Sequence, residues 1–349
     1  MNEYIAFDSH KRYTLAERED ARTGRARQQR VEHRPGAIRE YLRDCPAGAS
    51  VAVEALGSWY WIVEEIEQAG LVPRLVHPRK AKLMMGMINK TDKLDVHGLN
   101  RLQRNGTLPT VWIPPAGLRD QRELTRTRMV VVRERTRLKN RITSSLAKYG
   151  LAVEGQRDSF APGAREELEG LMKRLPEHTR WTSELLLGQL EVVGEQIGQL
   201  EGRLEAVLEP TAAMQLQRTL PGFGPILSAV VVLEMGQVER FPDAEHFASY
   251  SGVTPRVHSS GGKTRYGPFR PDVNRYLKWA FVEAGNVVAL HADRHPDRHV
   301  TRLYRRLAEA KGHSKAIGAV ARHLAEATYW VQVRRQAYRD PGLDRVRKA

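Results

Sequence analysis

The sequence predicts a mixed α/β domain, followed by a helical middle region and a mostly helical C-terminal domain. Over residues 1–115, short apolar runs alternate with amphipathic stretches, which is typical of a mixed α/β layer. Residues 118–146 contain neither glycine nor proline and predict one long helix. Farther on, apolar residues recur at alternating spacings of four and three, which indicates a helix with a single apolar seam.

The first domain is expected to span residues 1–150. Its apolar runs predict strands at residues 4–7, 11–16, 51–53, 75–77 and 110–112, and helices at 37–43 and 59–69. Residues 150–180 contain Pro162, Gly163 and Pro176, so we interpret them as a linker with a helical piece near residues 165–175. The second region would then cover 151–210, and the third 211–349.

The apolar seam of the middle region has two interpretations. It consists of Leu186, Leu190, Val193, Ile197, Leu200, Leu204 and Val207 and is ended by Pro210. It could belong to a helix of an intramolecular bundle, or to a coiled-coil stalk through which chains associate. Four glycines weaken its helix propensity but would let two helices approach closely: Gly188, Gly194, Gly198 and Gly202. We favour the stalk, and hence a dimer or tetramer.

The charge of the chain favours a polyanionic partner. Its 56 Lys and Arg residues exceed its 41 Asp and Glu residues, so the formal net charge is +15. Nucleic acid is the first candidate. A membrane surface is the alternative, but no segment approaches about 18 uninterrupted apolar residues. One cysteine, Cys45, excludes an internal disulfide framework and a cysteine-rich zinc site. We expect no signal peptide and a cytoplasmic protein at the bacterial nucleoid.

Four acidic residues are the strongest candidates for catalysis. Asp8 and Glu54 each end a short apolar run, and Asp92 and Asp95 lie on one helix face that Thr91 can cap. Converging carboxylates repel one another unless a cation lies between them. Mg²⁺ (or Mn²⁺) prefers such ligands together with water and phosphate oxygens, and two ions can assist phosphodiester cleavage. The alternative is that each acid is an ordinary helix cap or surface residue.

Arginine is concentrated on the long helix. Eight arginines lie between residues 119 and 141: Arg119, Arg122, Arg126, Arg128, Arg133, Arg135, Arg137 and Arg141. Glu123 and Glu134 could pair with some of them on a solvated face. Because nearby acids are too few to pair with all, we favour contact with nucleic-acid phosphates.

The third region offers two turns. Gly222 and Gly224 precede an apolar helix, where backbone N–H groups could hold a phosphate, but a simple helix-capping turn fits equally well. Ser259 and Ser260 precede two glycines, with cations at Arg256, Lys263 and Arg265. Either serine could attack a phosphate, although composition alone favours a flexible turn. Three histidines spaced by four residues, His291, His295 and His299, are interrupted by Pro296, so we assign no metal to them.

Seven blocks in order resemble insertion-sequence transposases that pair an N-terminal RuvC-like DEDD domain with a C-terminal serine-bearing domain. Site-specific DNA invertases of the Piv type share this plan. The blocks are residues 5–8, 53–55, 90–95, 220–225, 249–255, 259–263 and 274–277. Asp8 follows Ala-Phe where the family more often has Gly-Ile.

This resemblance implies roles for individual residues. Asp8, Glu54, Asp92 and Asp95 would bind Mg²⁺ (or Mn²⁺), and Ser260 would join covalently to DNA. The tandem serines leave the register open, so Ser259 is the second candidate. Some family members are guided by a bridge RNA, which implies DNA and a guide RNA as partners. The alternatives are a metal-dependent RuvC-like junction nuclease, a Piv-like invertase without guide RNA, and a non-catalytic nucleic-acid-binding protein.

Overall fold

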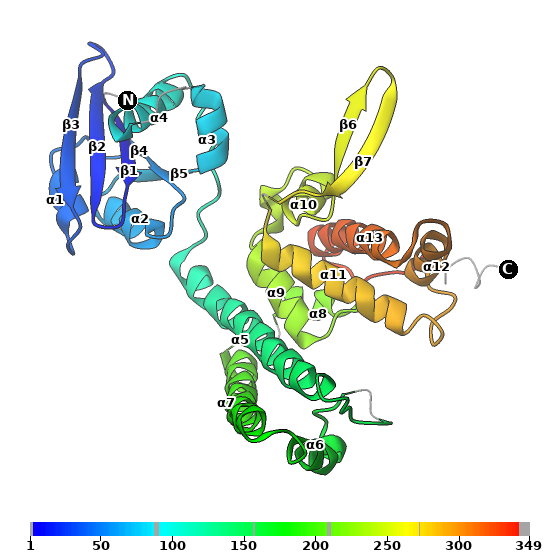
Figure 1. The fold of residues 1–349 in the computed structure, drawn as a ribbon. Coiled ribbons are helices and arrows are strands. Elements are labelled where there is room, and N and C mark those ends of the chain that lie inside the picture. The colour runs from blue at the N-terminus through cyan, green and yellow to red at the C-terminus, as the bar shows by residue number, and fades with distance from the viewer. Residues whose placement is uncertain (1–2, 87–90, 156–157, 208–210, 272, 342–349) are drawn as a thin grey trace. The chain divides into compact units, whose positions relative to one another are not determined.

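The computed structural model describes residues 3–86, 91–155, 158–207, 211–271 and 273–341. The chain forms two compact units, Met1–Pro114 and Pro115–Ala349, and each is described by itself (Figure 1). The division into three functional domains expected from the sequence, 1–150, 151–210 and 211–349, stays a prediction.

The N-terminal unit contains a five-stranded mixed sheet in the order β3-β2-β1-β4-β5. Its strands are β1 (Glu3–Ser9), β2 (Tyr13–Asp20), β3 (Ala26–Glu32), β4 (Ser50–Glu54) and β5 (Val72–Val76). Strands β1, β4 and β5 run parallel, whereas β2 is antiparallel to both β1 and β3. The expected strands at 4–7, 51–53 and 75–77 and the hairpin partner after β1 are confirmed. Residues 110–112 form only an isolated bridge, from Thr110 to Val76.

Helices cover both faces of this sheet (Figure 1). Ile5, Phe7, Val51 and Val53 pack toward α1 (Ala37–Leu42) and α2 (Trp59–Gln68), as one apolar cluster shows. Ala6 and Ala52 pack on the opposite face against Val96 and Leu99 of α4 (Asp92–Arg104), beside α3 (Pro78–Met85). This arrangement is consistent with the RuvC-like class expected from the sequence.

The C-terminal unit begins with the expected long helix, α5 (Ala116–Ala147). It packs against α7 (Glu177–Val207), and α6 (Arg165–Met172) lies between them in the chain. Leu138 and Ile142 of α5 share an apolar cluster with Leu190, Val193 and Ile197 of α7.

The central part of the apolar seam is therefore buried within the chain, as the intramolecular alternative predicts. Because α5 covers Leu190, Val193 and Ile197, the preferred stalk is wrong for these three residues, and association through other parts of the chain stays a prediction. The side chain of Val207 and Pro210 lie outside the described residues.

The rest of this unit is mostly helical, as expected. Its elements are α8 (Ala212–Gln217), α9 (Pro225–Met235), α10 (Ala244–Tyr250), the hairpin of β6 (Pro255–Ser260) and β7 (Lys263–Phe269), α11 (Arg275–Leu290), α12 (His299–Lys311) and α13 (His313–Arg334). Phe247, Phe281 and Leu324 centre their shared core. Figure 1 shows the hairpin projecting from these helices. In the part of the chain that is described, no helix is long and apolar enough to cross a membrane.

Candidate functional site

Two of the predicted acids meet around a histidine beside the end of β1. The Nε2 atom of His10 lies 3.4 Å from Oδ2 of Asp8 and 3.2 Å from Oδ2 of Asp92. One ligand atom from each of these three residues lies within 4.8 Å of the other two. Tyr13 donates a hydrogen bond of 3.1 Å to the same Asp92 oxygen. The arrangement joins carboxylates that are 84 positions apart in the sequence.

The local sequence explains why these groups converge. Side chains alternate along a strand, so Asp8 shares the α4 face with Ala6, and Glu54 shares it with Ala52. Phe7 pairs with Val53 in parallel register, which places the two acids at neighbouring strand ends.

The other two acids come from the start of α4. The Thr91 side chain accepts a hydrogen bond of 3.3 Å from the Leu94 backbone N–H and so caps the helix. Asp92 and Asp95 therefore fall in the first turn, over the face that carries Asp8 and Glu54. The close three-residue group contains Asp8 and Asp92 but neither Glu54 nor Asp95.

The donor atoms fit a divalent cation. Asp8 is buried, with 8% of its surface exposed, and buried carboxylates require a counter-charge. The separations of 3.2 and 3.4 Å are close to the roughly 3.0 Å edge of an octahedron with ligand bonds of about 2.1 Å. Burial and the hydrogen bond to Asp92 raise the pKa of Tyr13, which keeps its phenol protonated as a donor. Sequence reasoning missed His10, although an Asp-x-His spacing at a strand end returns both side chains to one side.

The two candidate serines lie at the tip of the β6–β7 hairpin. Ser260 pairs with Lys263, and Gly261 and Gly262 form the two-residue loop with φ values of 56° and 73°. Two successive positive φ values are typical of a type I′ turn, which explains the pair of glycines. The turn alternative is thus correct as a description of the backbone, and both serines are exposed.

The hairpin register separates the two serines. Ser259 faces Thr264, with their hydroxyls 3.4 Å apart. Ser260 lies on the other face, together with Lys263 and, two pairs farther from the tip, His258 and Arg265. Arg256 is also exposed but lies in an irregular part of the ladder. Cations therefore accompany Ser260 rather than Ser259.

The Gly-x-Gly turn before α9 has a packing explanation. Gly222 has a φ of 84°, and a Cβ atom there would lie 2.3 Å from the Ala284 carbonyl oxygen of α11. Gly224 is the N-cap of α9, and Pro225 occupies the first turn, where it contributes no N–H group. The helix-capping alternative accounts for both glycines, and their contact with phosphate stays a prediction.

The arginines of α5 divide into internal and exposed groups. Arg119 and Arg122 are buried, with 3% and 4% of their surfaces exposed, so the expectation that they contact nucleic acid is wrong in this fold. Arg122 donates to the carbonyl oxygens of Leu233 and Glu234 at 2.8 and 2.9 Å. Arg126 pairs with the Glu234 carboxylate at 2.7 Å.

A second group remains available on the same helix. Arg133, Arg137 and Arg141 are exposed at four-residue spacing, which aligns them on one side of α5. Arg137 donates to Glu134 at 3.0 Å, an exposed pair of little energetic weight.

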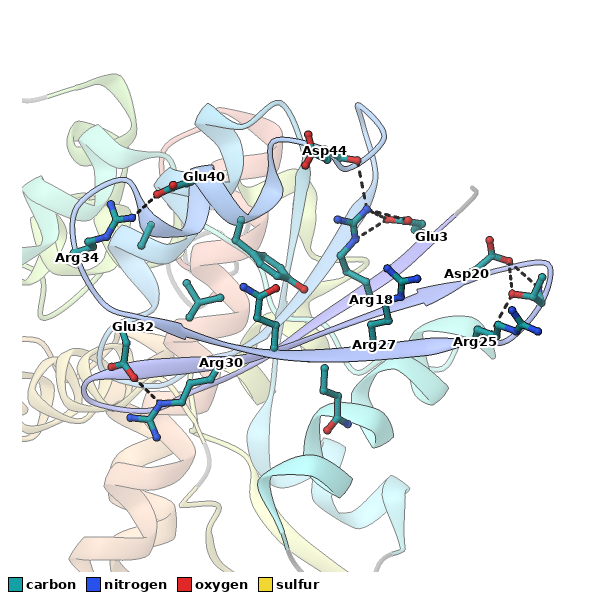
Figure 2. A pocket seen from close by; sticks show the side chains of 16 residues that line it. Glu3, Arg18, Asp20, Arg25, Arg27, Arg30, Glu32, Arg34, Glu40 and Asp44 are labelled. Atoms are coloured by element: carbon teal, nitrogen blue, oxygen red, sulfur yellow. Dashed lines mark hydrogen bonds and ion pairs between the residues drawn. The ribbon is translucent and has the colours of Figure 1, made fainter.

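A large groove in the N-terminal unit is also rich in arginine (Figure 2). Its volume is about 1180 Å³, and residues of β2, β3 and α1 line it. Figure 2 shows Arg18 paired with Glu3 at 2.8 Å, Arg30 with Glu32 at 2.6 Å, and Arg34 with Glu40. None of the four candidate catalytic acids lines it. Its charges are largely balanced, so it is a weaker candidate for a phosphate surface than exposed α5.

Comparisons with known proteins identify the family. Residues 7–150 match a family model described as a transposase, of the DEDD type named for IS110, and residues 214–301 match a model of the IS116/IS110/IS902 transposase family. The chain is 28% identical over 258 residues to a probable family 20 transposase of Pseudomonas aeruginosa, covering 72% of this chain and 74% of the relative. It is 24% identical over 292 residues to the transposase of insertion sequence IS1111A of Coxiella burnetii, covering 83% and 79%.

The two matched segments contain the features described above. The first includes all four acids, and the second includes both serines and the Gly-x-Gly turn. A DEDD transposase domain implies use of a divalent metal ion, which agrees with the group formed by Asp8, His10 and Asp92. The chain belongs to the IS110/IS116 family of transposases, which are enzymes of DNA recombination.

Proposed function

We propose that this transposase cleaves and exchanges DNA strands with a Mg²⁺ site and a covalent serine–DNA intermediate. The observation that carries the metal site is the convergence of Asp8 and Asp92 on His10. Asp8, Glu54, Asp92 and Asp95 would be the metal ligands, with His10 as an additional ligand from the same strand end. A bound Mg²⁺ would polarise the scissile phosphate and stabilise developing negative charge.

The protein groups around this site have separate tasks. Tyr13 donates to Asp92 and so holds one carboxylate oxygen in place. His10 lies between two carboxylates, and its Nε2 atom would be directed at the ion. The first turn of α4 supplies Asp95, whose side chain is partly exposed on the side from which a DNA phosphate could approach.

The covalent step would belong to Ser260. Its Oγ atom would form a bond to phosphorus while the bond from phosphorus to the departing sugar oxygen breaks, and the serine proton would pass to solvent. Attack by a hydroxyl of the incoming strand would reverse the linkage and release Ser260, so no external energy source is required. The register supports Ser260 over Ser259, because Lys263 and Arg265 share its face and can balance phosphorane charge.

DNA contact would use exposed cations of the C-terminal unit. Arg133, Arg137 and Arg141 form a line along α5, and Lys263 and Arg265 lie near the hairpin tip, with Arg256 at the other end of β6. Such contacts are salt-sensitive and largely independent of sequence. A guide RNA would supply target choice by base pairing, with the protein reading helix shape and phosphates. The two parts of the centre would come together in a dimer or tetramer.

A nicked suicide substrate tests the covalent step. The full-length protein with Mg²⁺ should form a protein–DNA adduct that survives denaturation. Ser260→Ala should abolish the adduct, whereas the matched variant Ser259→Ala should retain it. An adduct in Ser260→Ala would overturn the assignment, and Mg²⁺-dependent cleavage without any adduct would favour the metal-only nuclease.

The metal site and the guide have independent tests. Asp8→Asn should abolish strand exchange while salt-sensitive DNA binding persists, and full activity in excess EDTA would contradict the metal site. Sequencing of nucleic acid that co-purifies at low salt should yield one discrete structured RNA. Recombination by RNA-free protein would contradict the guided interpretation and favour an invertase-like reaction.

A further inference from the structure

We propose a second, structural metal site in the N-terminal unit, in which Glu17, Glu19 and His97 bind a divalent transition-metal ion that fastens α4 to β2. This site lies outside the acidic quartet and uses none of its residues. Glu17 and Glu19 are two positions apart on β2, so both side chains lie on the face covered by α4. Ligand atoms from the three residues all lie within 4.8 Å of one another.

Burial makes these carboxylates unusual. Glu17 and Glu19 each expose only 1% of their surface, and ionised carboxylates in such positions need a compensating charge. Nδ1 of His97 lies 3.1 Å from Oε1 of Glu17. The His97 side chain is about half exposed, at 51%, which leaves a route from solvent to the cluster. A buried pair of acids with one open side is a suitable setting for an ion.

Two buried polar atoms point to a missing ligand. Oε2 of Glu19 and Oδ1 of Asn100 are buried and accept no hydrogen bond from the residues that the structure describes. Asn100 is fully buried, and its amide group lies 3.0 Å from Oε1 of Glu17. The Nδ2 atom of Asn100 donates this hydrogen bond, so its Oδ1 atom would face the cluster only if a bound cation favoured rotation of the amide. Leaving such an atom unsatisfied is costly, and a cation would directly satisfy Oε2 of Glu19.

In the described part of the chain, the hydrogen bonds within the cluster leave Oε2 of Glu19 without a partner, whereas both oxygens of Glu17 accept hydrogen bonds, and an ion would replace the donors at Oε1 of Glu17. Gln28 donates to Oε2 of Glu17 at 2.6 Å, so Oε1 is the atom directed toward His97 and Asn100. Arg104 donates to Oε1 of Glu19 at 2.6 Å, which leaves Oε2. Groups of this kind orient ligands around a metal and hold them in place.

The distances and donor types indicate the class of ion. The separation of 3.1 Å between Oε1 of Glu17 and Nδ1 of His97 matches the roughly 3.0 Å ligand–ligand edge of an octahedron with bonds of about 2.1 Å. Two carboxylates with an imidazole suit Mn²⁺ or Zn²⁺ better than Ca²⁺. The competing explanation is that protonated His97 and Arg104 neutralise the two glutamates without any metal, and the experiment separates the two.

The ion would stabilise the position of α4. His97 and Asn100 lie one to two turns after Asp92, on the helix whose first turn carries two catalytic candidates. A metal bridge from β2 to His97 would therefore limit movement of Asp92 relative to Asp8. The role is positional, since the ligands of this site are distinct from the group formed by Asp8, His10 and Asp92.

Mn²⁺ binding to the full-length protein tests the proposal. The triple variant Asp8→Asn/His10→Ala/Asp92→Asn removes the first site, and titration followed by electron paramagnetic resonance should still show about one Mn²⁺ per chain. Adding His97→Ala should weaken this binding by about 10- to 100-fold. Adding His178→Ala, an exposed histidine of α7, is the matched control and should leave the binding unchanged.

Two results would overturn the second site. One is absence of Mn²⁺ binding in the triple variant with native circular dichroism, and the other is equal binding after His97→Ala. If His97→Ala does not fold, pulsed spectra of the triple variant decide the question, since a directly bound imidazole nitrogen couples to Mn²⁺. Spectra without nitrogen coupling would then contradict the proposal. Metal binding is measured without DNA, so this test does not depend on whether Ser260 reacts with DNA.

Discussion

Replacing Glu234 should destabilise the C-terminal unit by more than its position in an apolar helix suggests. Glu234 is fully buried in α9, and Arg126 donates to its two oxygens at 2.7 and 3.0 Å. Asn274, the N-cap of α11, donates to Oε2 at 2.8 Å, and Nε of Arg122 lies 3.7 Å from the same atom. One carboxylate thus joins α5, α9 and α11, and its removal leaves buried positive charge uncompensated.

The size of the effect follows from these contacts. Breaking a buried ion pair by removing one partner costs about 3–5 kcal/mol. Arg122 keeps its carbonyl acceptors at Leu233 and residue 234, and Arg126 is one-fifth exposed, so we expect the lower end, about 3 kcal/mol, for Glu234→Ala. Glu201→Ala is the matched control. Glu201 of α7 pairs with Arg128, which lies on α5 like Arg126, but this pair is nearer the surface, so its loss should cost less than about 1 kcal/mol.

Hydrogen exchange resolved by mass spectrometry can measure the loss locally. Protection in peptides from α9 and α11 should fall by about 3 kcal/mol in Glu234→Ala, whereas peptides from β1 and β4 should keep theirs. The melting temperature of the unit should fall by roughly 6–12 °C, at about 2–4 °C per kcal/mol for a unit of this size. A loss no larger than that of Glu201→Ala would refute the assignment of Glu234 as the shared counter-charge.

Three further predictions concern single residues. Gly222→Ala should destabilise the C-terminal unit by about 2–4 kcal/mol in urea unfolding, because the new Cβ atom would meet the Ala284 carbonyl and the φ of residue 222 is positive. Gly224→Ala, which has open space around it, should cost less than about 1 kcal/mol. Equal costs for the two variants would contradict the packing argument. His10→Ala should weaken Mn²⁺ binding at the Asp8 site about tenfold or more by calorimetry, whereas His77→Ala should not, and unchanged affinity would exclude His10 as a ligand. Burial, assisted by the positive charge of His299, lowers the pKa of His323, so the folded state disfavours its protonation and the free energy of unfolding should fall as the pH decreases below about 6.5. His323→Gln should reduce the difference in unfolding free energy between pH 7.5 and pH 5.5, measured by denaturant titration. An unchanged difference would contradict this role of His323.

The sequence predicts the apolar strands of the sheet because burial imposes a visible pattern. Strand β4 reads Ser-Val-Ala-Val-Glu and is almost fully buried. Strand β3 reads Ala-Arg-Gln-Gln-Arg-Val-Glu, and Val31 is its one buried residue. The strand is otherwise exposed because it lies at the sheet edge, where it is held mainly by its hydrogen-bonded ladder with β2. A strand stabilised by pairing rather than by burial leaves no alternation to detect.

Long-range pairing explains the errors about α5 and α7. Counting acids near the arginines in sequence could not find Glu234, which lies 108 positions from Arg126 yet forms its ion pair. The seam of α7 has the spacing of a coiled coil, but that spacing describes one apolar side and does not specify which helix covers it. In this fold α5 covers it, through Leu138 and Ile142.

The same distinction applies within the candidate site. Asp8, Glu54, Asp92 and Asp95 could be selected from sequence because each follows an apolar run or a helix cap, which are local signals. The participation of His10, and the separation of Ser259 from Ser260 on opposite faces, depend on where β1 ends and on the two-residue hairpin loop. These are matters of register, and a one-residue shift would reverse them.

The packing of α4 shows how the fold can hold repelling acids together. Its apolar residues Val96 and Leu99 contact Ala6 and Ala52, whose small side chains let the helix approach the sheet closely. Full burial of each large aliphatic side chain contributes about 1.5–3 kcal/mol, so this contact can offset repulsion between Asp92 and Asp8 in the absence of a cation. The helix end is therefore placed by apolar burial, and a metal ion adds to an arrangement that already exists. The consequence is that binding of a metal ion between Asp8 and Asp92 would require little rearrangement of α4, and such preorganisation lowers the cost of binding.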